Sequence, residues 1–204
     1  MKKHGILMTP ENALKCYLGT KGVTRRLMKW RPIGVASVTK HNNGWLFLDD
    51  EGRVICRMTP KYSVGAIVAI KEYHWRWGRK EKNPAGNWRL RCIQPTNVPE
   101  IIFQPPDIRV DKECDGYHGV SGLFLPFDLA RTHWEIVDVR PERLQECNEA
   151  EACLEGYPGF TACGMSAVVW MMQLWDSINP DHPWVDNDWV WRYKGRKVTT
   201  CLQR

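Results

Sequence analysis

Short runs of β-branched and aromatic residues recur along the chain and are separated by turn signals. Asn42-Asn43-Gly44 divides two such runs. The run 66–70 is apolar throughout, as in a buried strand, and the run 88–93 alternates apolar with basic residues, as in a half-buried strand. The pattern therefore predicts strands at 35–39, 45–48, 54–58, 66–70, 88–93, 133–139 and 189–198.

Three segments predict helices. Thr9 can cap a helix that begins at Pro10 and stops at Gly19. A second helix is expected from the cap Asn148 to Gly156, and the strongest helical spacing covers 166–178.

Many short strands with a few helices predict an α+β fold with a small barrel or a curled sheet, although the pattern does not select its topology. The length of 204 residues suits one domain, 1–204. The Pro-, Asp- and Gly-rich stretch 95–122 is expected to be a long insertion loop in that domain.

Charge is distributed unevenly along the sequence. Residues 1–99 hold 19 Lys/Arg and 6 Asp/Glu, a net charge of +13, and residues 100–204 hold 10 and 17, a net charge of −7. Together with 11 tryptophans, the basic half indicates a face for a polyanion such as RNA. The alternative is that the two halves of the sequence do not form two separate halves of the folded chain.

The eight cysteines are scattered, and none forms a Cys-x-x-Cys pair. Neither a metal site nor a cofactor is therefore expected, and free thiols in a reducing compartment are the simplest interpretation. The opening 20 residues do not resemble an export signal, and no apolar run approaches membrane-spanning length. We expect a cytoplasmic protein with no membrane partner, in the host cytoplasm if a phage encodes it.

Several ordered blocks resemble the ASCH-domain proteins of phages and prophages. The block Gly19-Thr20-Lys21-Gly22-Val23-Thr24-Arg25-Arg26 is similar to that family's G-x-K-T-x-T-R-R. Further similar blocks lie at 6–8, 64–72, 127–144, 151–156, 174–179 and 189–191. The resemblance implies a PUA-like β-barrel with flanking helices. It also implies either RNA binding or, as in small bacterial relatives, hydrolysis of N4-acetylcytidine. Gly22, Ala66 and Lys71 depart from the family's Thr, Asp and Arg.

The same resemblance implies a catalytic trio of Lys21, Thr24 and Glu155. A threonine hydroxyl needs a base to become a nucleophile, and a desolvated lysine can act as that base. Glu155 would orient the lysine or pass a proton to the leaving amine. Each residue also has an ordinary alternative: a phosphate contact, a turn hydroxyl and the last residue of an exposed helix.

Binding residues are expected in two groups and at Arg131, for which a role in the cleft and structural pairing are both open. Arg25 and Arg26 can bind phosphate or stack on bases, but they can equally pair with the acidic half. The run 71–80 interleaves aromatic and basic residues, as single-strand binding requires, although a strand with one buried aromatic face would show the same pattern. The substrate-binding candidates are Arg25, Arg26, Lys71, Trp75, Trp77 and Arg131.

Three functions fit these features. The chain could be a module that binds RNA or a modified nucleoside, or an amidohydrolase that removes an acyl group from N4-acylated cytidine. It could also be a phage protein that binds a host protein through its basic half.

Overall fold

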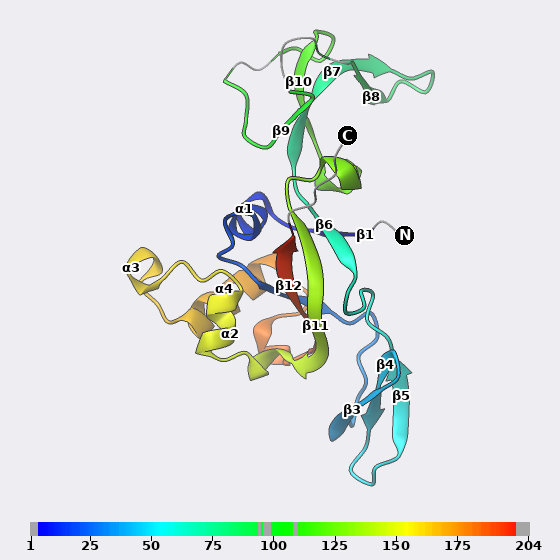
Figure 1. Cartoon of the computed structure of the whole chain (residues 1–204), viewed down its shortest axis with the longest axis vertical. Helices are drawn as coiled ribbons and strands as arrows, with labels where there is room; N and C mark the ends of the chain where they lie inside the picture. The colour runs from blue at the N-terminus through cyan, green and yellow to red at the C-terminus, as the bar shows by residue number, and fades with distance from the viewer. Residues whose placement is uncertain (1–3, 94, 96–98, 108–109, 199–204) are drawn as a thin grey trace. The chain divides into compact units, whose positions relative to one another are not determined.

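The computed structural model describes residues 4–93, 95, 99–107 and 110–198, and it shows a mixed α+β fold dominated by strands (Figure 1). The described residues fall into two compact units. Unit 1 contains those within 4–14 and 68–133, and unit 2 contains those within 15–67 and 134–198. Helix α1 (Pro10–Leu18) begins in unit 1 and ends in unit 2.

Unit 2 is built on three hydrogen-bonded strands and a separate β-meander. The three strands are β11 (His133–Arg143), β12 (Trp189–Val198) and β2 (Val23–Leu27), in that order across the sheet. The meander contains β3 (Ser37–His41), β4 (Gly44–Leu48) and β5 (Val54–Met58), which pair in that order. The helices are α2 (Glu149–Leu154), α3 (Phe160–Cys163) and α4 (Ala167–Ile178).

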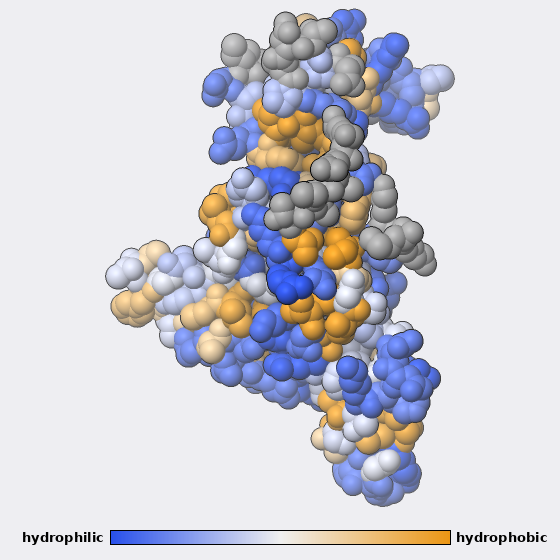
Figure 2. Space-filling view, in the orientation of Figure 1, coloured by the Kyte–Doolittle hydropathy of each residue, from blue (hydrophilic) through white to orange (hydrophobic). Residues whose placement is uncertain are grey.

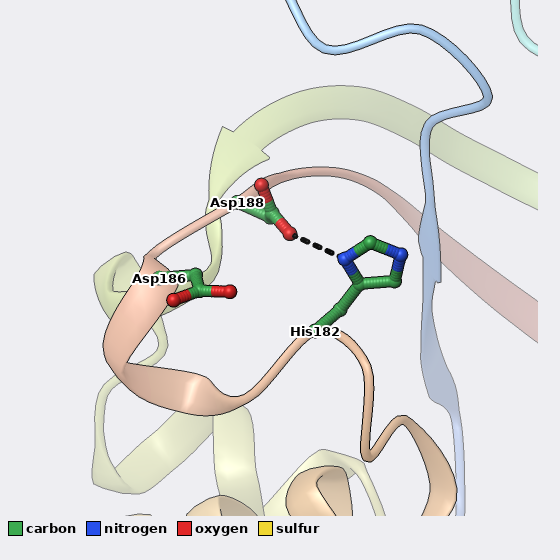
Figure 3. Close-up of side chains that lie close together, drawn as sticks. All are labelled: His182, Asp186 and Asp188. Atoms are coloured by element: carbon green, nitrogen blue, oxygen red, sulfur yellow. Dashed lines mark ion pairs between the residues drawn. The ribbon is translucent and has the colours of Figure 1, made fainter.

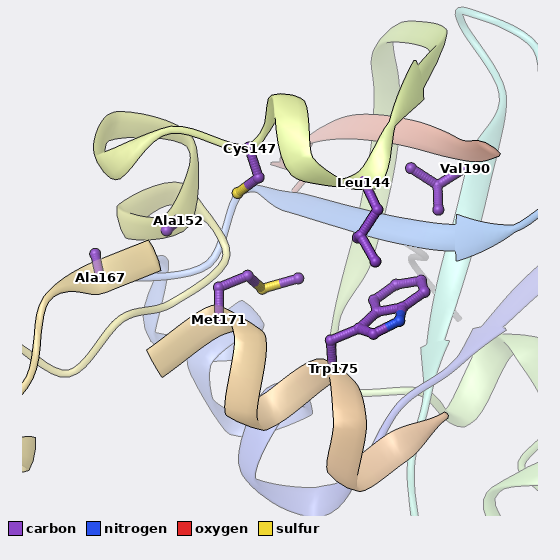
Figure 4. Packing of buried hydrophobic residues seen from close by; sticks show 7 residues of the cluster. All are labelled: Leu144, Cys147, Ala152, Ala167, Met171, Trp175 and Val190. Carbon is purple, nitrogen blue, oxygen red and sulfur yellow. The ribbon is translucent and has the colours of Figure 1, made fainter. Parts of the chain in front are cut away.

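The helices cover one face of the unit 2 sheet. Met171 and Trp175 of α4 pack with Leu144 and with Val190 of β12 in a buried apolar cluster (Figure 4). Alternation along β12 directs Arg192 to the face of Val190. The other face holds residues such as Trp189, whose ring meets Phe47 of β4 edge-on at 5.2 Å.

Unit 1 contains a parallel pair and a larger antiparallel sheet. In the pair, β1 (His4–Leu7) lies beside β6 (Ile67–Lys71), whose first residue belongs to unit 2. In the antiparallel sheet, β7 (His74–Lys82) is flanked by β8 (Trp88–Cys92) and β10 (Gly116–Val120). The short β9 (Ile101–Ile102) also pairs with β7, and an apolar cluster forms around Ala69, Leu125 and Ala130.

The α+β prediction is confirmed, and the expected helices form. Thr9 and Asn148 accept hydrogen bonds at the helix starts, as their side chains predicted, and Ser166 does the same at the start of α4 (Ala167–Ile178). The segment 95–122 differs from the expected continuous loop, because it contributes β9 and β10 to the unit 1 sheet. Strand pairing closes no barrel among the described residues, so the PUA-like barrel and the single domain stay predictions.

The seven cysteines within the described part of the chain are all free thiols, and Cys201 lies outside it. None of the helices that the structure describes is long and apolar enough to cross a membrane.

Candidate functional site

Lys21 and Glu155, two of the proposed catalytic residues, meet in unit 2 although 134 positions separate them. Lys21 Nζ donates one hydrogen bond to the Glu155 backbone carbonyl at 2.7 Å and another to its carboxylate Oε2. Lys21 is 4% exposed and Glu155 is 2% exposed, so this ion pair is removed from water. The exposed-helix alternative for Glu155 is therefore wrong.

Local backbone structure brings the pair together. Glu155 is the C-terminal cap of α2, and Gly22 N donates to the Leu154 carbonyl at 2.9 Å. Gly156 follows with a φ of +96°, a conformation that favours glycine. A Cβ at Gly156 would also lie 2.9 Å from Lys15 Cδ and 3.4 Å from Lys21 Cβ. The Glu155-Gly156 pair thus combines the helix end with the close approach of the lysine.

Arg25 is the centre of the same buried network. Its Nε donates to Glu142 at 2.7 Å, and Nη1 donates to Glu155 at 3.0 Å. Nη2 donates to Glu151 at 3.2 Å, and the side chain is 0% exposed. Burial alone would lower the pKa of Arg25, but the carboxylates of Glu155 and Glu142 outweigh it and the pKa is raised. Arg25 therefore has the ion-pair environment that its sequence context left open.

Arg192 and Arg140 extend the network. Arg192 donates to both carboxylate oxygens of Glu151, at 2.6 and 2.8 Å, and to Asp138 at 2.9 Å. Arg140 donates to Glu142 at 3.1 Å. Burial opposes ionisation of Glu151, but the hydrogen bonds and charge of Arg192 dominate and its pKa is lowered. Each carboxylate around Arg25 thus has a second cation.

Thr24 and Arg26 lie on the other face of β2. In the pairing of β2 with β12, Thr24 is opposite Tyr193 and Arg25 is opposite Arg192. Alternation therefore directs the Thr24 side chain away from the Arg25 side. Thr24 is 5% exposed, and its hydroxyl makes no hydrogen bond to any described residue. Burial lowers the pKa of Arg26, against the attraction of Glu155 and Tyr62.

The basic and acidic halves of the sequence do not coincide with the two units of the structure. The described range of unit 2 holds 16 Lys/Arg and 14 Asp/Glu, a net charge of +2. Lys21 and Arg25 come from the basic half, and their partners Glu142, Glu151 and Glu155 come from the acidic half. Much of the asymmetry is therefore neutralised inside unit 2.

The other binding candidates lie in unit 1. Lys71 Nζ donates to the Leu123 carbonyl at 3.2 Å. Trp75 and Trp77 are half-buried on β7 and meet Tyr73 and Tyr117 edge-on, at 5.8 and 5.1 Å. Both indoles thus keep exposed surface while neighbouring rings hold them.

Arg131 forms a bidentate ion pair with Glu72 in unit 1. Arg131 Nε and Nη2 donate to the two Glu72 carboxylate oxygens at 2.8 and 2.7 Å. Glu72 is 1% exposed, and burial raises its pKa although Arg131 opposes that effect. Structural pairing, one of the two roles considered for Arg131, is the arrangement found.

His74 lies beside this pair and is fully buried. Its Nδ1 is 3.2 Å from the Glu72 carbonyl, and its Nε2 has no hydrogen-bond partner among the described residues. Burial lowers the pKa of His74, and the charge of Arg76 adds to that effect. The unfolded chain therefore binds a proton at a higher pH than the folded chain.

We expect stability to fall as the pH drops below about 6.5, where unfolded histidine becomes charged. His74→Asn should reduce the slope of melting temperature against pH between about pH 5 and 8, which circular dichroism measures. Glu72 contributes with the opposite sign but is common to both proteins, so its effect largely cancels in the comparison. An equally steep decline in the variant would contradict the assignment to His74.

A separate polar group near the end of α4 was not predicted. One ligand atom each from His182, Asp186 and Asp188 lies within 4.8 Å of the others (Figure 3). Arg31 already contacts two of them: its Nη1 is 2.8 Å from His182 Nδ1 and 2.9 Å from Asp188 Oδ2. The group therefore has an internal cation, and its geometry is explained as an ion-pair cluster.

Sequence reasoning missed the residues that surround the expected trio. Glu142 and Asp138 lie within the similar block 127–144, and Glu151 lies three residues after the expected helix cap Asn148. Alternation along β11 places Asp138 and Glu142 on one side of the strand, a signal that could have indicated a shared site. No protein-family model matches the chain, and neither curated proteins nor solved structures show a significant match to it.

Proposed function

We propose that the chain is an ASCH-type, PUA-like domain that removes an acyl group from an N4-acylated cytosine base. The observation that carries the proposal is the buried ion pair between Lys21 and Glu155 at the C-terminal end of α2. These residues match the lysine and glutamate of the hydrolases that the sequence resembles. They are in contact although 134 positions separate them in the sequence. A buried amine and carboxylate in contact can exchange a proton, as acid–base catalysis requires.

In the proposed reaction, Lys21 Nζ passes a proton to the Glu155 carboxylate, with which it forms an ion pair, and the amine then acts as a base. Thr24 Oγ1 loses its proton to Lys21 Nζ and attacks the amide carbonyl carbon. The C–N bond then breaks, and the leaving base amine takes a proton from the pair. Water hydrolyses the threonine ester, releasing the carboxylic acid and restoring Thr24.

The position of Thr24 suggests a second form of the same reaction. Its hydroxyl lies on the opposite face of β2 from Arg25, and it makes no hydrogen bond within the described chain. Lys21 could instead take a proton from water, which would attack the acyl carbon directly. Substituting Thr24 distinguishes the two forms, because only the first requires its oxygen.

The first test is incubation of the full chain with N4-acetylcytidine, followed by chromatography for cytidine and acetate. We expect both products in equal amounts, since one amide bond is broken. N4-acetyl-2′-deoxycytidine tests whether the sugar hydroxyl matters. A folded protein that cleaves no N4-acylated nucleoside would leave a non-catalytic binding module as the better interpretation.

That binding module is the second candidate function. It is supported by the half-buried Trp75 and Trp77 in unit 1, which do not depend on the unit 2 network. The third candidate, a host-protein partner, has no observation of comparable weight, because Lys21 and Arg25 of the basic half are already paired within unit 2.

A further inference from the structure

One face of the antiparallel sheet in unit 1 carries aromatic side chains and arginines in separate zones. Trp75, Trp77 and Arg79 alternate along β7 and therefore share a face. Tyr117 of β10 is in register with Trp77, and Arg91 of β8 is in register with Arg79. Residues opposite each other in an antiparallel pair point to the same side. We call this set, together with Arg89, the Trp–Arg face.

The aromatic zone is held rigidly by its neighbours. Trp77 meets Tyr117 edge-on at 5.1 Å, and the Tyr117 hydroxyl donates to the Pro99 carbonyl at 2.6 Å. Tyr73 meets Trp75 edge-on, and its hydroxyl occupies the space over Gly119, where a Cβ would lie 1.7 Å away. Rings fixed before binding lose little conformational entropy when a ligand stacks on them.

The arginine zone keeps its charges accessible. Arg79 pairs with Asp115 at 2.8 Å and Arg91 pairs with Glu81 at 3.2 Å, but all four side chains are close to half exposed or more. Such exposed pairs are weak because water and salt screen them, so a phosphate can replace the carboxylate. The Arg89 side chain is exposed and makes no hydrogen bond or ion pair with a described residue. Figure 2 shows hydrophilic surface at the top, where β8 lies in Figure 1.

We propose that the Trp–Arg face binds single-stranded nucleic acid, with bases on Trp75 and Trp77 and phosphates on the arginines. Base stacking on aromatic rings beside a basic track is the chemistry by which proteins bind single strands. Residues 71–92 carry seven Lys/Arg and two Asp/Glu, a net charge of +5, which complements the phosphate backbone.

The spacing of the two indoles suits an extended strand. A β-strand rises about 3.3 Å per residue, so Trp75 and Trp77 are about 6.6 Å apart along β7. That separation is about twice the rise of about 3.4 Å between stacked bases, which leaves each indole room for a base. Duplex nucleic acid lacks free base faces and should bind this surface more weakly.

The test measures binding of end-labelled, unmodified uridine and thymidine 12-mers by fluorescence anisotropy at about 50 and 200 mM salt. Since these oligomers carry no acyl group, the result is independent of the deacylation proposed for unit 2. We expect Trp75→Leu and Trp77→Leu each to weaken binding roughly 5- to 150-fold, the cost of losing one base stack. Trp77→Phe retains an aromatic face and should recover most of the affinity. The uridine and thymidine arms identify whether RNA or DNA is preferred.

Two matched controls separate this face from a general effect. Trp88 is in register with Lys82, so it lies on the opposite face of the same sheet, and Trp88→Leu should leave binding unchanged. Arg91 and Arg53 side chains are both 71% exposed, but Arg53 lies in unit 2. Arg91→Gln should lower the slope of log affinity against log salt by about 0.7, and Arg53→Gln should not.

Melting temperatures of all variants establish that they are folded. The proposal is overturned if neither 12-mer binds at the lower salt. It is also overturned if Trp77→Leu and Trp77→Phe bind equally well, because stacking then plays no part, or if Trp88→Leu weakens binding as much as Trp77→Leu.

Discussion

Lys21→Met is expected to reduce kcat for deacylation of N4-acetylcytidine by about 10²–10⁴-fold, the contribution of a positioned acid–base group. Methionine retains the length and packing of the side chain but cannot accept a proton. Lys21→Arg should fail similarly, because arginine stays protonated. Glu155→Gln should also lose activity, because the amide cannot take a proton and keeps only one acceptor oxygen for the donors Lys21 and Arg25.

Substitutions at Thr24 then identify the attacking atom. If Thr24 is the nucleophile, Thr24→Val should be as inactive as Lys21→Met, since residues that act as one unit lose nearly the same rate singly. Activity that survives in Thr24→Val but is lost in Lys21→Met would assign the attack to water. Turnover by Lys21→Met within tenfold of the unsubstituted protein would reject Lys21 as the base. Circular dichroism spectra distinguish these results from unfolding.

Helices α2 and α4 of unit 2 could be predicted because their end signals are local. The α2 cap at Asn148 and the α4 cap at Ser166 need only the neighbouring backbone. Strand β2 was not predicted, because Val23-Thr24-Arg25-Arg26-Leu27 contains three polar residues in succession. Its pairing with β12 and the carboxylates around Arg25 come from distant segments, and tertiary contacts of this kind override local propensity.

Strand β10 illustrates the same limit in unit 1. Gly116-Tyr117-His118-Gly119-Val120 has the composition of a turn, and glycine is disfavoured in strands. In the structure, the Tyr73 side chain fills the space beside Gly119. A glycine that predicts a loop from composition is thus required by the packing of a strand.

The candidate centre was predictable only in part for a similar reason. Family resemblance indicated Lys21 and Glu155, but sequence spacing could not show their contact or the three carboxylates around Arg25. Nor could it show that Thr24 lies on the other face of β2, because β2 itself was not predicted. The residues that resemble a motif were therefore easier to find than the partners that determine how they can react.

Arg25→Met should destabilise the chain by about 3 kcal/mol, the lower end of the range for breaking a buried ion pair from one side. Its side chain is 0% exposed, and its removal leaves three carboxylates with fewer hydrogen bonds. The loss should not reach the upper end of about 5 kcal/mol, because Lys21, Arg140 and Arg192 still contact these carboxylates.

Urea unfolding of Arg25→Met and Arg196→Met provides the comparison. Arg196 donates to Glu135 at 2.6 Å, but its side chain is 69% exposed, so its removal should cost less than about 1 kcal/mol. Arg25→Lys should fall between the two, because an ammonium keeps the charge but cannot reproduce the planar fork that reaches Glu142, Glu151 and Glu155. Equal free energies of unfolding for Arg25→Met and Arg196→Met would show that the buried network contributes nothing beyond a surface pair. A loss of activity in Arg25→Lys without a loss of stability would instead make Arg25 a positioning residue for Glu155.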